Sequence, residues 1–336
     1  MTWNMVQCAV QGRGHLSSGT PCQDKTFSIV KDACSVCALA DGAGSACFSH
    51  FGAEAVTQKI CNYIAENFDL FINEEKGASV KKSILKSIGE RLESLCDEKS
   101  CSVKDLASTL LFVAEKAGMF IICHIGDGVI GYVKEGEVLV ASHPENGEFA
   151  NTTVFTTSSN AIANMKLIKG ILNQISGFIL MSDGAEASLY NKREKVLSPS
   201  LARLIKLASV CDVNYMSQKL NIAFENLVKQ KTSDDCSIVL MSQEVGGRGY
   251  MDLPAKDKCE LLGLANTRVS RKRLKSVEDV LMALEMWQTY RATKRKLHWR
   301  GKKLDRVLKR LVNANLLQAR EDGCYKSALR AFFSED

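Results

Sequence analysis

The sequence predicts an α+β fold in which antiparallel sheets are covered by pairs of helices, followed by a smaller helical C-terminal domain. Apolar runs of strand length come in blocks, and adjacent helical patterns separate these blocks instead of alternating singly with strands. Charge then divides the chain. Residues 250–336 hold 20 Lys and Arg against 11 Asp and Glu, whereas the preceding residues hold 24 against 27. This split indicates two units.

The composition excludes several classes of protein. With 46% hydrophobic and 24% charged residues among 336, the chain is neither disordered nor of low complexity. Its apolar runs stop short of the ~20 residues that a membrane span needs, and the N-terminus lacks the features of a signal peptide. We therefore expect a soluble, cytoplasmic protein that does not contact a membrane.

Cysteines are numerous, but they do not indicate disulfides or zinc. There are thirteen, an odd number at irregular spacing, and most lie in apolar runs where a free thiol packs as a small hydrophobe. The single CxxC, Cys34 to Cys37, lies in a predicted strand, so its two thiols should face opposite sides. We expect both to pack in the core.

The expected elements follow from periodicity. Apolar runs predict strands near 4–11, 34–40, 119–125, 129–133, 137–142, 153–157, 177–182 and 236–241. Helical spacing of apolar residues predicts helices around 56–68, 80–95, 201–208 and 216–227. A hairpin turn is expected at 134–137.

Domain boundaries come from a change in composition. Ser242 to Lys258 carries three Gly and one Pro without apolar periodicity, which is typical of a linker. We therefore predict a first domain at 1–243, a linker at 244–258 and a basic helical domain at 259–336. Two helical stripes and a hairpin turning at Asp322-Gly323 make this last domain resemble a winged helix.

One pattern carries chemistry: an apolar run that ends in Asp-Gly. It occurs at Asp41, Asp127 and Asp183; a fourth acidic point, Asp234-Asp235, precedes a predicted strand, and a fifth, Asp24, lies early in the chain. A single Asp-Gly is more often a hairpin turn, and that alternative stays open for Asp127, where an apolar run resumes at once. Small and helical residues follow Asp41 and Asp183 instead.

Carboxylates gathered at one end of a sheet repel one another unless a cation lies among them. Carboxylate and carbonyl oxygens are hard donors, which suit Mg²⁺ or Mn²⁺ better than zinc. A glycine after each Asp lets the side chain and the main-chain carbonyl approach the same ion. The pattern therefore predicts a divalent-metal site.

In order, GTPCQD, ALADGAGS, STLL, HIGDG, LMSDG and TSDDCSIVLM resemble the successive motifs of the metal-dependent (type 2C, PPM) protein serine/threonine phosphatases. The opening GRGHLSSGTPCQD is most similar to a bacterial branch of that family, and the resemblance covers about residues 5–242. It implies a four-layer α/β/β/α sandwich with two Mn²⁺ or Mg²⁺ ions at one end and a third, weaker site. The implied activity is the hydrolysis of phosphoserine and phosphothreonine by a metal-activated water, without a nucleophilic side chain.

The resemblance also implies roles for residues. Asp41 would bridge both metals, with the Gly42 carbonyl completing one coordination sphere. Asp183 and Asp234 would hold the first metal and Asp24 would support the second, whereas Asp127 with Asp183 would form the third site. Asp41 and Asp183, as ligands of the metals, are therefore the acidic residues that we expect to be catalytic.

The chain departs from the family pattern at several positions. The Arg that commonly clamps the substrate phosphate has its equivalent near Gly19, which is not basic, so Arg13 or His15 is the candidate, evenly balanced against a solvated loop. Ala43 stands where eukaryotic relatives often have a His; His50 could substitute, although a surface role is favoured. Gln23 replaces a Glu and Asp235 an Asn. A pseudophosphatase scaffold is therefore the first alternative.

Basic and aromatic residues alternate in the C-terminal domain. Five Lys and Arg fall within 268–275 and seven more within 291–303, with Tyr290 and Trp299 among them. This pattern suits nucleic acid, or an acidic or phosphorylated protein, and we favour the protein. The overall prediction is a signalling phosphatase whose partners are phosphoproteins and a cognate serine/threonine kinase; a nucleic-acid-binding regulator is the second alternative.

Overall fold

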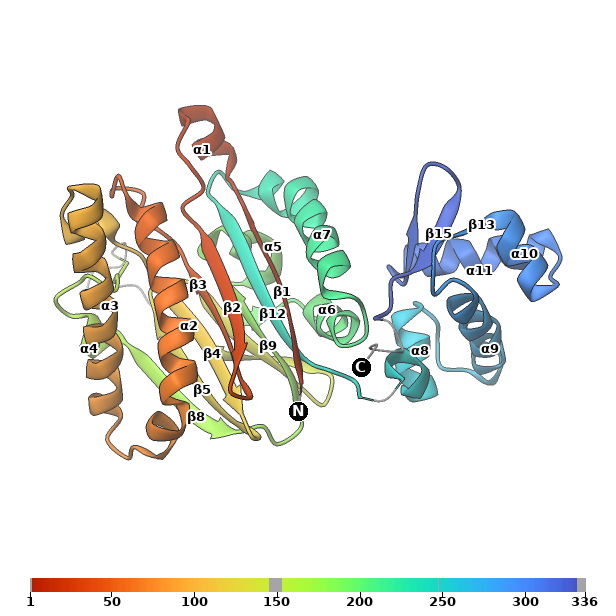
Figure 1. The fold of residues 1–336 in the computed structure, drawn as a ribbon, viewed down its shortest axis with the longest axis horizontal. Helices are drawn as coiled ribbons and strands as arrows, with labels where there is room; N and C mark the ends of the chain where they lie inside the picture. The colour runs from red at the N-terminus through yellow and green to blue at the C-terminus, as the bar shows by residue number, and fades with distance from the viewer. Residues whose placement is uncertain (1, 145–152, 247, 331–336) are drawn as a thin grey trace. The chain divides into compact units, whose positions relative to one another are not determined.

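Two five-stranded antiparallel sheets form the larger part of the computed structural model, which describes residues 2–144, 153–246 and 248–330 (Figure 1). The first sheet has the order β1 (Trp3–Val10), β12 (Cys236–Gln243), β9 (Ile175–Met181), β6 (Val129–Lys134) and β7 (Glu137–Ser142). The second has the order β2 (Lys25–Lys31), β3 (Cys34–Ala40), β4 (Leu110–Lys116), β5 (Met119–Ile125) and β8 (Lys166–Ile171).

Helices cover the outer faces of the sheets (Figure 1). On the second sheet lie α2 (Ser49–Asn73) and α3 (Gly77–Lys99), and on the first lie α6 (Ser200–Ala208) and α7 (Val213–Ala223). Short elements occupy the connections: α1 (Arg13–Ser18), η1 (Val103–Leu106), α4 (Ala161–Asn164), η2 (Asp183–Ala185), α5 (Glu186–Leu189), β10 (Tyr190–Asn191), β11 (Val196–Leu197), η3 (Phe224–Val228) and η4 (Lys229–Lys231). The four layers are those of the predicted α/β/β/α sandwich.

Strand β3 shows how apolar packing holds the two sheets to each other and the helices to the second sheet. All seven of its residues are buried, so the strand is a continuous apolar run without alternation. Cys34 packs in the core beneath α2 and α3, whereas Cys37 packs in the core between the two sheets. The prediction that these thiols face opposite sides is confirmed, and all thirteen cysteines are free.

The predicted strands are confirmed except at 153–157, where only Thr153 has a bridge and Thr156 donates its N–H to the carbonyl of Ser108. Three strands of the two five-stranded sheets escaped prediction. Both β2 and β8 lie at sheet edges with only partly buried, lysine-bearing sequences, and β4 is rich in the helix formers Leu, Ala, Glu and Lys. The turn at 134–137 is confirmed, with positive φ at Glu135 and Gly136.

The structure also decides the role of Asp127-Gly128. The apolar runs on either side of it, β5 and β6, belong to different sheets, so this dipeptide is not a hairpin turn. It is the point where the chain crosses from one sheet to the other.

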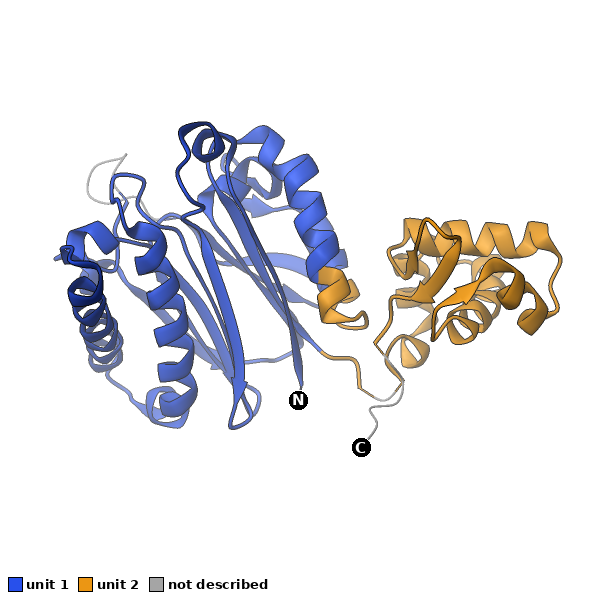
Figure 2. Cartoon of the chain, turned by 45° about the horizontal axis from the view of Figure 1, so that its top comes forward, with its two compact units in different colours: residues 1–205, 217–243 blue, residues 206–216, 244–336 orange. Residues whose placement is uncertain are grey.

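The chain divides into two compact units, residues 1–205 with 217–243 and residues 206–216 with 244–336 (Figure 2). The sequence did not indicate that 206–216 join the second unit, which they do through a bridge between Cys211 and Leu329. Within the predicted linker, η5 (Gly249–Asp252) and the start of α8 (Ala255–Leu261) are helical, and Tyr250 is buried.

Unit 2 continues with α9 (Arg268–Ala283), β13 (Gln288–Thr289), α10 (Tyr290–Leu297), α11 (Gly301–Asn313), β14 (Leu317–Ala319) and β15 (Cys324–Ser327). Its antiparallel sheet has the order β13-β15-β14, so the predicted hairpin is present and gains a third strand. This succession of helices and strands is that of a winged helix. Among the described residues, no helix is both long and apolar enough to span a membrane.

Candidate metal centre

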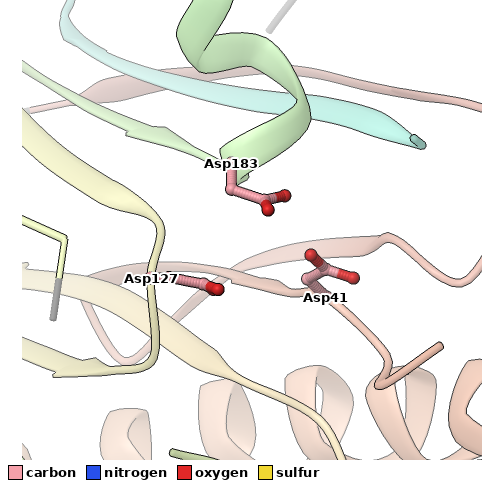
Figure 3. A group of neighbouring side chains, drawn as sticks. All are labelled: Asp41, Asp127 and Asp183. Atoms are coloured by element: carbon pink, nitrogen blue, oxygen red, sulfur yellow. The ribbon is translucent and has the colours of Figure 1, made fainter. Parts of the chain in front are cut away.

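Three carboxylates from both sheets converge at one end of the sandwich (Figure 3). One oxygen from each of Asp41, Asp127 and Asp183 lies within 4.8 Å of the others. These residues follow the C-terminal ends of β3, β5 and β9. Antiparallel pairing thus brings together the three Asp-Gly motifs that are far apart in the sequence.

Two more of the predicted acids lie within electrostatic reach of Asp41. Burial raises the pKa of Asp41 well above its usual range, and the charges of Asp24, Asp183, Asp234 and Asp127 raise it further. Asp24 lies beside Asp41 because of the strand register: Lys25, which follows Asp24, pairs with Ala40, which precedes Asp41. All five predicted acids are therefore gathered at one site.

Burial and mutual repulsion also raise the pKa of Asp183 to about 7 and that of Asp24 to about 6. Neither oxygen of Asp24 nor Oδ1 of Asp183 has a hydrogen-bond partner of normal geometry among the described residues, although the hydroxyls of Ser182 and Ser237 moderate the pKa of Asp24. Buried carboxylate oxygens without a donor are costly unless a cation satisfies them. With oxygen donors alone, the cluster fits Mg²⁺ or Mn²⁺.

Thr109, from the STLL motif, fixes the backbone of Asp41. The N–H of Asp41 donates to the Thr109 hydroxyl at 2.9 Å, and the N–H of Thr109 donates to the carbonyl of Asp41 at 2.8 Å. The Thr109 methyl also packs against Gly126, where a Cβ would lie 2.5 Å from it and where φ is +111°. One threonine thus holds Asp41 and the turn that carries Asp127.

His124 and Thr153 orient Asp127. The Thr153 hydroxyl donates to Oδ2 of Asp127 at 2.6 Å. The buried His124 ring places Nε2 at 2.9 Å from the carbonyl of Gly126 and Nδ1 at 2.6 Å from Oγ of Ser142. Burial lowers the pKa of His124 to about 3, so the ring is neutral and acts as a structural support.

Asp235 organises the opposite side of the site, where the sequence had suggested only an Asn-to-Asp change. This buried carboxylate accepts the N–H groups of Gly12 and Gln23, both at 2.6 Å, and lies 2.9 Å from Nδ1 of His15. A Cβ on Gly184 would lie 1.9 Å from the Asp235 carbonyl oxygen, so only glycine allows this approach. Asp235 therefore joins the loops that carry Asp24 and Asp183.

The side chain of Gln23 is used structurally. Its amide donates to Oγ of Ser49 at 2.7 Å, at the start of α2. The main-chain carbonyl of Gln23 accepts the N–H of Gly42 at 3.3 Å, so Gly42 is held directly beside Asp41. The Gln23 side chain therefore anchors this loop to the start of α2.

The remaining basic candidates differ in position. Exposed Arg13 donates from Nε to the carbonyl of Thr232 at 3.0 Å, two residues before Asp234, whereas His15 faces Asp235. His50 lies on α2 with its ring 4.1 Å from that of Phe51, and it belongs to no group of acids that the structure brings together. Of the three, Arg13 combines exposure with proximity to a predicted ligand.

A cavity of about 260 Å³ borders Asp127 and Asp183 and was missed by sequence reasoning. Its other lining residues are His143, Pro144, Glu186, Tyr190, Lys192 and Lys195. Lys192 pairs with the buried carboxylate of Glu186, and the charges of Asp183 and Asp127 add to the rise in the pKa of Lys192. The sequence signal that could have indicated this cavity is the cluster of charged residues directly after the third Asp-Gly motif.

The family model described as protein phosphatase 2C matches residues 11–225. Serine/threonine-protein phosphatase 3 of Escherichia coli (strain K12) is 26% identical over 174 residues, which is 49% of this chain and 67% of that protein.

Among solved structures, the serine/threonine phosphatase of S. agalactiae matches with a TM-score of 0.52 and 16% identity, over 72% of this chain and 100% of that one. The serine/threonine phosphatase Stp1 of Staphylococcus aureus matches with a TM-score of 0.50 and 14% identity, over 73% and 96%. At these identities the structural matches establish a shared fold, the predicted sandwich of two antiparallel sheets.

Proposed function

Because the chain belongs to the protein phosphatase 2C family, whose members are serine/threonine protein phosphatases, we propose that it hydrolyses phosphoserine and phosphothreonine at a centre of two Mn²⁺ or Mg²⁺ ions. The observation that carries this proposal is the convergence of five carboxylates, of which Asp24 and Asp183 have buried oxygens without a hydrogen-bond partner of normal geometry. In a scaffold protein that binds no metal, the repulsion among these carboxylates would remain uncompensated.

By motif position, we assign Asp41 to both metals, the Gly42 carbonyl to one of them, Asp183 and Asp234 to the first, and Asp24 to the second. Asp127 with Asp183 would hold a third, weaker ion, which the short distance among Asp41, Asp127 and Asp183 supports. Burial differs among them, since Asp24 is buried and Asp234 is exposed. Asp234 is therefore the ligand that solvent reaches most easily.

When bound, the two cations lower the pKa of a shared water and stabilise charge on the phosphoryl oxygens. The chain's own residues supply rigidity: Thr109 fixes Asp41, and Thr153 with His124 fixes Asp127. No protein nucleophile is needed, and the thiol of Cys236, two residues after Asp234, is unsuited to the task. Burial raises the pKa of Cys236 to about 12, so it stays protonated at neutral pH.

Substrate binding is assigned to two cationic positions. Arg13 would bind the phosphate, since it is exposed beside the Asp234 loop while His15 is engaged with Asp235. The cavity that Lys192 and Lys195 line would receive substrate residues that flank the phosphoamino acid. We further propose phosphoproteins of the cytoplasm as substrates and a cognate serine/threonine kinase as the enzyme that phosphorylates them.

The test is hydrolysis of a phosphothreonine peptide in Mn²⁺, in Mg²⁺ and in EDTA, by the wild type and by Asp41→Asn, with Mn²⁺ binding followed by calorimetry. We expect turnover that requires metal and is lost in the variant, together with weaker Mn²⁺ binding. Binding of Mn²⁺ without turnover would favour the pseudophosphatase, which Gln23 and the non-basic Gly19 suggest. A folded protein that binds no Mn²⁺ would overturn the metal centre.

A further inference from the structure

The outer face of α11 in unit 2 carries a stripe of polar, mostly cationic side chains. Lys302, Arg306, Lys309 and Asn313 are spaced i, i+4, i+7 and i+11, so they lie along one side of the helix. All four are exposed. The opposite side, with Leu304, Leu308 and Leu311, is buried in the core of the unit. The helix is thus anchored by one face and presents the other to solvent.

Among the described residues, no ion pair compensates the charge around this stripe. Residues 290–310 contain ten Lys and Arg against one acid, Asp305, and Asp305 accepts a hydrogen bond from the Tyr290 hydroxyl. In the described part of unit 2, the ion pairs of basic side chains involve Lys206, Arg248, Lys258 and Arg330 instead. The basic surface of α10 and α11 is therefore available to an external anion.

Local contacts position the ends of this surface. Nζ of Lys303 lies 3.5 Å from the centroid of the Trp299 ring, which holds the loop that precedes α11. The guanidinium of Arg320, where the β14–β15 hairpin begins its turn, lies 3.7 Å from the centroid of the Trp287 ring. The hairpin tip itself carries Glu321 and Asp322, so the cationic surface is formed by the helices.

We propose that unit 2 binds double-stranded DNA, with the exposed face of α11 in the major groove. That groove admits an α-helix, and Lys and Arg contact phosphates and guanine edges while Asn contacts adenine. A protein partner would match the charge but would need an apolar interface core, and on this face of α11 only the edge residue Val312 is a large exposed hydrophobe. Double-stranded RNA has a major groove too narrow for a helix.

The experiment uses the full chain and a fluorescently labelled random-sequence DNA duplex, with binding followed by anisotropy at several salt concentrations. The variant is Lys302→Glu/Arg306→Glu/Lys309→Glu. The matched control is Lys76→Glu/Lys82→Glu/Lys104→Glu, which reverses three exposed charges of unit 1. We expect the wild type and the control to bind at low salt, with log K falling linearly with log salt. The α11 variant should bind at least roughly tenfold more weakly, with a salt slope shallower by about 2–3.

Several outcomes would overturn the proposal: no binding at low salt, equal binding of a duplex RNA, or equal losses in the variant and the control. Thermal unfolding of each variant separates loss of binding from loss of fold. Asp41→Asn should bind DNA as the wild type does, because the proposal does not depend on the phosphatase activity. An acidic peptide that binds α11 where DNA does not would assign the surface to a protein partner instead.

Discussion

The acidic centre of unit 1 and the basic surface of unit 2 are both collections of like charges, but they differ in burial. Asp24 is buried and Asp41 and Asp183 are half-buried, so burial and mutual repulsion raise the pKa values of these three carboxyl groups and call for a bound cation. The exposed Lys and Arg side chains of α10 and α11 lie in solvent, where water and salt screen them. Burial therefore couples a charge cluster to the stability of the fold, whereas exposure leaves the cluster available to a binding partner.

The strongest test of the buried half of this comparison is Asp183→Asn. We expect turnover to fall by at least roughly 10²–10³-fold, the loss typical of one electrostatic stabiliser, since Asp183 lies between two proposed metal positions. Asp127→Asn, which affects only the proposed third site, should lose less. Steady-state kinetics at several Mn²⁺ concentrations measures both. Equal losses in the two variants would contradict the assignment of Asp127 to a weaker site.

Thr109→Val should have the next largest effect. It keeps the shape of the side chain but leaves the N–H of Asp41 without its acceptor, a loss of about 1–3 kcal/mol in the free energy of unfolding. Turnover should fall more than KM changes, because the metal ligand is misplaced. Thr109→Ser restores the hydroxyl and is the control. If Thr109→Ser is as impaired as Thr109→Val, the methyl against Gly126 matters and the hydrogen bond does not.

These side chains show how far the sequence could be interpreted. Asp41 and Asp183 were identifiable because each follows a buried strand with a glycine after it, a purely local pattern. For Asp127 the local pattern left a turn and a ligand both open, and only the family resemblance placed it at a metal site. The structure excludes the turn because β5 and β6 lie in different sheets. The anchoring role of Asp235 and the cavity lined by Lys192 depend on contacts across the fold. No local pattern indicates such contacts.

The pH dependence of stability distinguishes the two regions. Without metal, folded Asp183 and Asp24 have pKa values of about 7 and 6, against 3.8 ordinarily, so between about pH 4 and 7 the folded chain binds more protons than the unfolded chain. The free energy of unfolding in EDTA should therefore rise as the pH falls through that window.

Excess Mn²⁺ should raise stability and flatten this slope, because bound metal replaces the protons. Chemical denaturation at each pH, with Asp183→Asn as the control, measures the contribution. The slope in EDTA should be smaller in that variant, whereas the α11 charge reversal should leave it unchanged. A wild-type slope in Asp183→Asn would show that other groups cause the pH dependence.

The smallest expected effect lies where the two kinds of charge meet. Arg13 is an exposed cation beside the acidic centre, so it should behave as the α11 side chains do, through screened attraction to an anion. Arg13→Ala should raise KM for a phosphopeptide by roughly 3–10-fold with little change in kcat, and the difference should shrink as salt increases. Arg13→Lys should retain part of the effect, because it keeps the charge and loses the fork geometry. A fall in kcat that salt does not alter would place Arg13 among the groups that act in the transition state, and the division between buried and exposed charge would not apply to it.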